Sequence, residues 1–315
     1  MSNSITTDWL NLRKEPVIFK ENIITVLPPG TVVEKDDTKS NDKWSHIKTH
    51  IVNNDFDGYA ATPYLKDTDK SLTISSPSTI AIPRVHLQPS EGTLISRRNI
   101  AGRAYPLNEK DLQRIPLLSS LGIQSCINAV NGALDYLDVE HSERYAPTTA
   151  QTYCNIYAYD VAYCLSGEDN SGPFVPRVWW NEGALADIKQ GKTPEVIYAK
   201  TVDELNANSL TDWFENYGNM FNWERCLDIS TLQEKVNAGT LGIIVGQRIN
   251  LNNSGHIVSV IPETANHQAE RSGGKISSPL QSQAGSVNRK YTTGNNWWLN
   301  QNRFRKFGFW VYNIR

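Results

Sequence analysis

A cysteine and a histidine in this chain are the residue types of a thiol nucleophile and its general base. Cys154 lies in the sequence TYCNIYAYDV, where we predict the start of a helix. In the first turn of a helix, free backbone N–H groups and the helix dipole lower the pKa of a thiol toward the nucleophilic thiolate. The same N–H groups can donate to an oxyanion formed on attack. The alternative is that Cys154, beside Ile156 and Tyr157, is a small buried hydrophobic residue.

His256 opens the apolar run His256–Ile261, directly after an Asn-Asn-Ser-Gly turn. A histidine at the start of such a strand can reach a helix N-terminus and act as a base, whereas one facing solvent at a turn has no such role. The other histidines lie in the N-terminal strands, a linker, a charged loop and a polar stretch: His46, His50, His86, His141 and His267. A cysteine at a helix start, followed by a histidine on a strand, is the order of papain-like enzymes.

A third polar side chain is needed to orient the imidazole, and several residues after the histidine strand could supply it. Gln283 is our first choice, because a strand over 280–284 would present Gln281 and Gln283 on one face. Glu263 and Asn266 are nearer in sequence but lie at or after a proline turn. Each alternative could instead be a solvated loop residue.

Two pairs of adjacent tryptophans are candidates for substrate contact: Trp179 with Trp180, and Trp297 with Trp298. Aromatic rings give large contact areas at low entropic cost, so they suit a groove for glycan or peptide. Adjacent residues on a strand point to opposite faces, so at most one of each pair would face a cleft. We predict substrate-binding roles for Trp179, Trp180 and Trp297, with core packing as the alternative.

Short strands separated by turn signals fill residues 1–66, which predicts a small β-barrel. Residues 67–109, rich in Ser, Thr, Pro and Asp, are expected to be a linker. The linker contains four apolar residues that could pack on the domain that follows, namely Ile80, Ile82, Val85 and Leu87.

Residues 110–315 change to helical periodicity and then to β-rich runs. Apolar residues at three- and four-residue steps predict a helix over 117–137. Further helices are expected over 151–166, 210–217 and 230–238, followed by strands over 241–249, 256–261 and 307–312. Helices followed by an antiparallel sheet make this part an α+β domain.

Both halves of the chain resemble known families. LNLR, the turn Leu27–Thr31, KWSHIK and a closing Gly-Tyr-Ala resemble the bacterial SH3-like domain. The Cys154 motif, PRVWW, and the run from LQEKVNAG to GHIV resemble papain-like amidases of the NlpC and CHAP type, which are peptidoglycan hydrolases. The resemblance implies Cys154 as nucleophile, His256 as base and cleavage of an amide bond in cell-wall peptide. For the SH3-like part it implies a module that targets the enzyme or positions its substrate.

The composition excludes several other classes of protein. With 39% hydrophobic and 20% charged residues the chain can bury a core, so it is not a disordered protein. A net charge of -2 gives no general field for nucleic acid, and the one short basic patch is Arg303, Arg305 and Lys306. Apolar stretches are about five residues long, against roughly 20 for a membrane span. No signal peptide is visible at the start, so we expect a cytoplasmic protein, export by a non-Sec route, or a trimmed chain.

The four cysteines form neither a disulfide framework nor a metal motif. Cys154 and Cys164 on one helix would be about 15 Å apart, too far to bridge, and a Cys126–Cys226 bridge stays open. There is no CxxC pair, so we predict no metal and no cofactor.

Three functions therefore compete. The first is cysteine-dependent hydrolysis of peptidoglycan or muropeptide. The second is a non-catalytic protein of cell-wall binding or assembly, in which Cys154 only packs. The third keeps the fold but transfers the acyl group to an amine instead of water.

Overall fold

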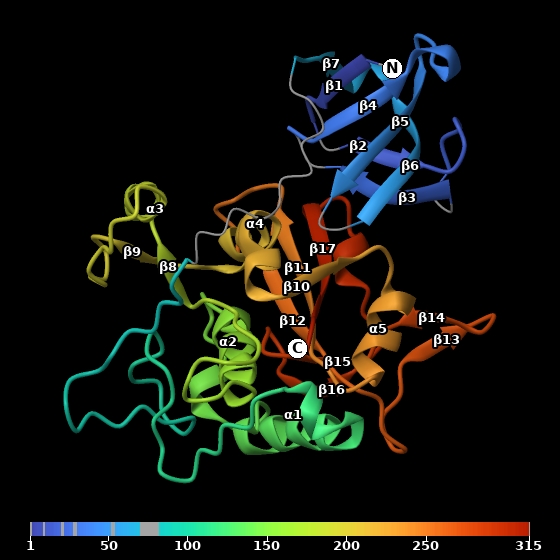
Figure 1. The fold of residues 1–315 in the computed structure, drawn as a ribbon. Helices are drawn as coiled ribbons and strands as arrows, with labels where there is room; N and C mark the ends of the chain where they lie inside the picture. The colour runs from blue at the N-terminus through green and yellow to red at the C-terminus, as the bar shows by residue number, and fades with distance from the viewer. Residues whose placement is uncertain are drawn as a thin grey trace. The chain divides into compact units, whose positions relative to one another are not determined.

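The computed structural model describes residues 2–8, 10–19, 22–27, 30–51, 54–69 and 82–314. The chain divides into two compact units, Met1–Thr79 and Ile80–Arg315. Figure 1 shows the strands of the first unit in blue and the helices and strands of the second from green to red. Each unit has its own core, so each is described by itself.

The first unit is an all-antiparallel sheet with the order β3-β2-β6-β5-β4-β1-β7. Its strands are β1 (Ser2–Thr6), β2 (Leu10–Arg13), β3 (Ile23–Leu27), β4 (Val32–Asp36), β5 (Trp44–Ile51), β6 (Asn54–Ala61) and β7 (Leu65–Asp67). Alternate residues of these strands face a small core, which consists of Leu10, Leu12, Leu27, Val33, Ile47 and Ala60.

The predicted closure into a barrel is not found, because within the described ranges no pairing joins the outer strands β3 and β7. The sequence pattern does not predict the first strand, β1. It is polar, but Ser4 and Thr6 are buried in alternation, so strand periodicity is carried by small polar residues. Pro28 and Pro29 of the predicted turn lie outside the described residues.

The second unit is α+β, as predicted, with helices packed on antiparallel sheet. The helices are α1 (Ile123–Leu137), α2 (Cys154–Cys164), α3 (Glu182–Lys189), α4 (Ala207–Tyr217) and α5 (Ile229–Asn237). The main sheet has the order β10-β17-β11-β12-β15-β16. Its strands are β10 (Trp223–Cys226), β11 (Gly242–Arg248), β12 (His256–Val260), β15 (Gln281–Gln283), β16 (Arg289–Thr292) and β17 (Phe304–Tyr312). The unit also contains two antiparallel pairs of short strands. They are β8 (Val178–Trp180) with β9 (Val202–Glu204), and β13 (Glu270–Ser272) with β14 (Lys275–Ser278).

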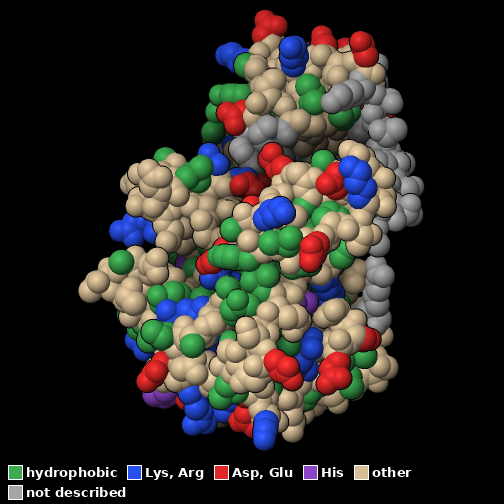
Figure 2. Space-filling view, turned by 90° about the vertical axis from the view of Figure 1, so that its left-hand side faces the viewer, with side chains coloured by type: hydrophobic (Ala, Val, Ile, Leu, Met, Phe, Trp, Pro, Cys, Tyr) green, Lys and Arg blue, Asp and Glu red, His purple; other side chains and the backbone are tan. Residues whose placement is uncertain are grey.

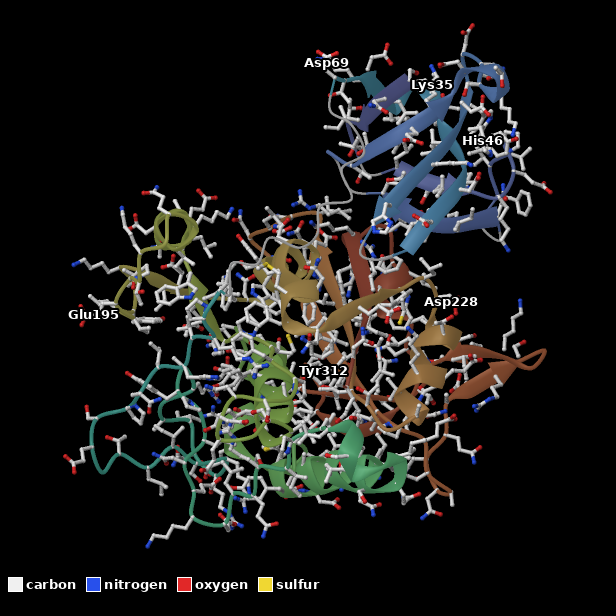
Figure 3. The ribbon with its side chains drawn as sticks, viewed as in Figure 1. Lys35, His46, Asp69, Glu195, Asp228 and Tyr312 are labelled. Atoms are coloured by element: carbon white, nitrogen blue, oxygen red, sulfur yellow. The ribbon has the colours of Figure 1, made fainter. Side chains whose placement is uncertain are left out.

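The two faces of the main sheet bury different cores. Ile243 and Val245 of β11 pack in the cluster that contains α1, α2 and α4, whereas Ile244 packs in the cluster of α5 and Trp298. This alternation follows from the period of two in a strand. Figure 1 shows α5 and α2 on different sides of the sheet. Asp228, labelled in Figure 3, begins α5 by accepting a hydrogen bond from the backbone N–H of Thr231 at 2.8 Å.

The predicted linker 67–109 is largely part of the second unit. Its apolar residues Ile82, Val85 and Leu87 are buried in the main core, and so are Ile95 and Leu107. Residues 70–81, including Ile80, lie outside the described residues. The lack of helical period in this segment predicts a linker, yet irregular backbone can still bury side chains against a sheet or helix.

A buried ion pair fixes the turn before α2. Nε of Arg144 lies 2.6 Å from Oδ2 of Asp160, and both side chains are fully buried. The hydroxyl of Tyr145 donates to the same carboxylate oxygen at 2.8 Å, and Nη2 of Arg144 donates to the Tyr105 carbonyl. Asp160 therefore has a structural role, because its carboxylate joins the turn at 143–145 to the middle of α2.

On the face turned to the viewer in Figure 2, Lys and Arg side chains are interspersed with Asp and Glu, and hydrophobic side chains are exposed between them. Over the described ranges, no helix is both long enough and apolar enough to cross a membrane. All four cysteines are free and buried, so Cys126 and Cys226 do not pair.

Candidate active site

Cys154 is the first residue of α2, as predicted from its sequence context. Only 4% of its surface is exposed. Burial raises the pKa of the thiol, while hydrogen bonding by the backbone amides of Ile257, Asn155 and Cys154 itself opposes that rise. Two of those amides are the free N–H groups of the helix start, and the third comes from β12. The resting group is thus a protonated thiol at the start of α2.

His256 begins β12 and is hydrogen-bonded to Gln283 on β15. Its Nε2 lies 2.9 Å from Oε1 of Gln283. An amide oxygen only accepts, so Nε2 carries the proton, and Nδ1 is the basic nitrogen of the neutral ring. Burial lowers the pKa of His256, with the Gln283 hydrogen bond opposing it, so the ring is neutral at pH 7.

Trp297 forms one wall of the imidazole site. Its ring meets the His256 ring edge-on, with centroids 4.7 Å apart. Gly246 is paired with His256 across β11 and β12, and a Cβ at Gly246 would lie only 2.8 Å from the Trp297 ring. Glycine at this position therefore leaves the room that the indole occupies.

The thiol and the imidazole flank the same strand end from different sides. Ile257 packs in the core cluster that contains Cys154, whereas Val258 packs in the cluster that Trp297 borders. Because side chains alternate along a strand, His256 starts on the Trp297 side and Ile257 on the α2 side. The backbone amide that reaches Cys154 is thus adjacent in sequence to His256. Among the described residues, no hydrogen bond joins the thiol to the ring.

The segments that lead into Cys154 and out of Gln283 meet at Asn288. Its Nδ2 donates to the carbonyls of Val139 and Tyr145, and its Oδ1 accepts from the backbone N–H of Gly285. A pocket of about 540 Å³ lies between these segments. Its lining includes Glu143 and Pro147 from the first and Arg289 from the second, so it offers charges of both signs beside a polar backbone.

Trp179 and Trp180, predicted to bind substrate, lie in the core instead. Trp179 is 3% exposed and packs edge-on against Trp213 and Phe221. Trp180 is 5% exposed and donates its indole N–H to the carbonyl of Pro83. The strand β8 is covered on both faces, so neither ring of this pair has a groove to face. Trp297 is the half-buried member of the predicted set and the one beside His256.

The alternatives to Gln283 lie away from the imidazole. Glu263 is engaged by Arg271 and Asn237, and Asn266 is exposed in the loop after β12. The side chain of Gln281 donates weakly to the carbonyl of Pro279. The structure thus brings Gln283 to His256, which is the pairing that the predicted strand over 280–284 required.

Two residues near the thiol received no role from the sequence. Asn155 donates from Nδ2 to the carbonyl of Leu205 at 2.9 Å, which anchors the first turn of α2 to the segment after β9. Arg177, part of the PRVWW motif, is buried, and its charge opposes in part the rise that burial causes in the pKa of Cys154. The one available signal was a charged residue preceding an otherwise apolar strand.

Comparison with known proteins leaves the family open: no family model matches the sequence, and a search of curated proteins finds no match.

Proposed function

We propose that this protein is a cysteine-dependent amidase or endopeptidase acting on the peptide of bacterial cell wall. The observation that carries the proposal is the His256–Gln283 hydrogen bond, which leaves Nδ1 as the basic nitrogen beside the strand end that touches Cys154. A thiol at a helix start, a neutral imidazole and an orienting amide are the three parts of a papain-like site.

The reaction begins when Nδ1 of His256 takes the proton of the Cys154 thiol. The thiolate attacks the amide carbonyl, and the resulting oxyanion accepts hydrogen bonds from backbone N–H groups at the start of α2. The amine leaves with the proton from Nδ1, and a thioester remains. Water, deprotonated by Nδ1, then cleaves the thioester and regenerates the thiol. For the first step the His256 ring must leave the Trp297 side of β12 and turn toward the thiol on the α2 side, because the two groups are not hydrogen-bonded in the unliganded protein.

The substrate class comes from the resemblance of the Cys154 and His256 motifs to NlpC- and CHAP-type enzymes. On this proposal the second unit has a papain-like fold, and the first is an SH3-like module that helps to place the wall peptide.

A non-catalytic wall-binding protein is the second candidate, and one observation favours it. The thiol is 4% exposed, and its pKa is raised by burial, which is the environment of a packing cysteine. In that case the papain-like unit is only a scaffold, and the Cys154 side chain only packs in the hydrophobic core.

The test is digestion of purified muropeptides by the wild type and by Cys154→Ala, with mass spectrometry of the products. We expect amide cleavage by the wild type and a loss of several orders of magnitude in the variant, because the covalent route is removed. An added amine separates hydrolysis from acyl transfer. Iodoacetamide labelling gives a second measure: an activated Cys154 reacts below about pH 8.5, and an inert one does not react. Equal turnover by the Ala variant would exclude Cys154 as nucleophile.

A further inference from the structure

The loop that leads into His256 is closed by one buried amide side chain, that of Asn208. Asn208 lies in the first turn of α4 and is 5% exposed. Its Oδ1 accepts a hydrogen bond from the backbone N–H of Arg248, the last residue of β11, at 2.9 Å. Its Nδ2 donates to the carbonyls of Leu251 at 3.2 Å and Asn253 at 2.9 Å. Both polar atoms of this side chain are therefore bonded to the backbone between β11 and β12.

The start of β12 packs directly against the same turn of α4, and Gly255, the residue before His256, allows the contact. A Cβ at Gly255 would lie 2.6 Å from Oδ1 of Asn208, 2.9 Å from its backbone nitrogen and 2.6 Å from the carbonyl oxygen of Gly246. These separations are well below the roughly 3.5 Å of van der Waals contact. Gln247 adds a bond from β11, since its Nε2 donates to the Asn208 carbonyl at 3.0 Å. Figure 1 shows α4 beside these strands.

The hold on this loop matters because the strand ladder ends here. The pairing of β12 with β11 begins at His256, so the loop 249–255 lies outside that ladder. The backbone N–H of the next residue, Ile257, is the one that reaches the Cys154 thiol. In the proposed reaction the imidazole turns toward the thiol, and a turn about side-chain bonds brings it there only if its Cα stays in place. The hydrogen bonds of Asn208 fix the backbone that carries this Cα.

We infer that Asn208 is a positioning residue for His256: its amide holds the loop 248–255, so that the backbone of the histidine stays within reach of Cys154 while the ring turns. Asn208 bonds to the loop backbone and takes no part in the proton transfer. The inference rests on the proposed function for the role of His256 as base. The hold on the loop is a property of the fold and does not depend on that role.

The environment of the imidazole gives a readout that needs no substrate. Burial has the largest effect on the pKa of His256 and lowers it, the hydrogen bond to Gln283 raises it, and the charge of Arg248 lowers it. Trp297, which packs against the ring, carries no charge. If the loop is released, water reaches the imidazole, so its pKa should rise toward about 6.5.

The experiment replaces Asn208 by Ala in the full chain. NMR titration follows the pKa of the His256 imidazole, with His256→Gln to assign its signal, and digestion of muropeptides gives kcat and KM. We expect the pKa to rise and kcat to fall by roughly 100-fold, which is the cost of displacing a reacting group by about 1 Å. KM should change less than kcat, because binding of the substrate does not require the base.

Gly255→Ala is a second variant, and it decides the question if Asn208→Ala does not fold. The added methyl group forces the start of β12 away from Asn208 and Gly246 while the amide of Asn208 stays intact. We therefore expect the same rise in the pKa of His256 and the same direction of change in kcat.

Asn22→Ala is the matched control, in the first unit. Asn22 is 3% exposed and closes a loop with the same set of bonds: its Oδ1 accepts from the N–H of Glu15 at 2.9 Å, and its Nδ2 donates to the carbonyls of Glu15 at 2.7 Å and Val17 at 3.0 Å. Its loss should destabilise the first unit and leave the pKa of His256 unchanged.

An unchanged His256 pKa in Asn208→Ala and Gly255→Ala would overturn the inference, even if both variants were less stable, because Asn208 would then be structural only. An unchanged kcat in a chain that cleaves muropeptides would overturn it as well. Failure of the proposed function gives a different result: the pKa of His256 still rises in Asn208→Ala, while the wild type cleaves no muropeptide.

Discussion

The hydroxyl groups of Tyr157 on α2 and Ser282 on β15 are hydrogen-bonded at 2.7 Å inside the core. Tyr157 lies one turn after Cys154, and Ser282 lies next to Gln283. This single bond therefore sets the register of the nucleophile helix against the strand that orients the imidazole. It joins two parts of the site that are far apart in the sequence.

Replacing Tyr157 by Phe should cost about 1–3 kcal/mol of unfolding free energy, because the buried Ser282 hydroxyl is left with only its long hydrogen bond to the Arg289 carbonyl, at 3.4 Å. Ser282→Ala should cost a similar amount, and the double variant should cost less than the sum of the two. Urea denaturation of the four proteins checks this. Strict additivity would show that the bond does not couple helix and strand.

Gln283→Ala should lower activity on muropeptides less than His256→Ala, because it disturbs the orientation of the ring and leaves the proton transfer itself possible. Parallel variants of Glu263, Asn266 and Gln281 are the controls, since none of them touches the imidazole in the structure. A loss of activity confined to Glu263 or Asn266 would mean that Gln283 only packs against the ring.

Acid should destabilise the protein through His86. Burial lowers the pKa of His86 to about 4, against about 6.5 for the unfolded chain, and its Nδ1 is 3.0 Å from the hydroxyl of Tyr159. The unfolded state therefore binds the proton first, so stability is lost as the pH falls from 6.5 toward 4. The contribution of this group is about 3 kcal/mol, converted from the shift in pKa.

A His86→Gln variant should lack that part of the pH dependence, although its stability at pH 7.5 is also changed by the substitution. Thermal denaturation of both proteins between pH 7.5 and 4 makes the comparison. Parallel pH curves for the two would show that His86 does not titrate differently on unfolding.

Asp160→Asn should destabilise the second unit by about 3–5 kcal/mol, because it leaves the Arg144 guanidinium charged and unpaired in the interior. Asp135→Asn is the matched control: Asp135 pairs with Lys290, but its side chain is 65% exposed, so its loss should be worth less than about 1 kcal/mol. Chemical denaturation measures both. A similar small effect for the two would contradict a structural role for the buried pair.

The start of the second unit can be located by truncation. A fragment beginning at Ile80 should be soluble and unfold cooperatively, since it keeps the buried residues of the segment 82–109. A fragment beginning at Lys110 loses Ile82, Val85, Leu87, Ile95 and Leu107, each worth about 1.5–3 kcal/mol of burial. The total for the five residues is comparable to the whole stability of a typical domain, so we expect this fragment to be unfolded or insoluble. Equal melting temperatures would restore the view of this segment as a linker.

Sequence patterns predicted the parts of this fold that repeat with a clear period. The helices α4 and α5 and the strands β11, β12 and β17 were expected within three residues of their bounds, since each shows one apolar face or one apolar run. The helix α1 ends at Leu137 as expected but begins at Ile123, six residues later than predicted. The strand holding Gln283 was expected from its position. The burial of Ile82 to Leu107 was not, because non-periodic backbone gives no pattern from which burial can be read. Asn208 has no role in the sequence analysis, because its hydrogen bonds to the loop before His256 are a property of the folded chain.

Gly246 pairs with His256 across β11 and β12 and has no Cβ atom. The environment of the imidazole depends on the absence of that atom. Any side chain at residue 246 would have to displace the Trp297 indole or the Phe304 ring, both of which lie within 3.1 Å of the place a Cβ would take. The indole packs edge-on against the imidazole, so its displacement would remove the ring contact on one side of His256 and leave the hydrogen bond to Gln283 in place. A methyl group at residue 246 of β11 would thus push Trp297 away from the imidazole. The His256 ring would then rotate about its remaining hydrogen bond to Gln283.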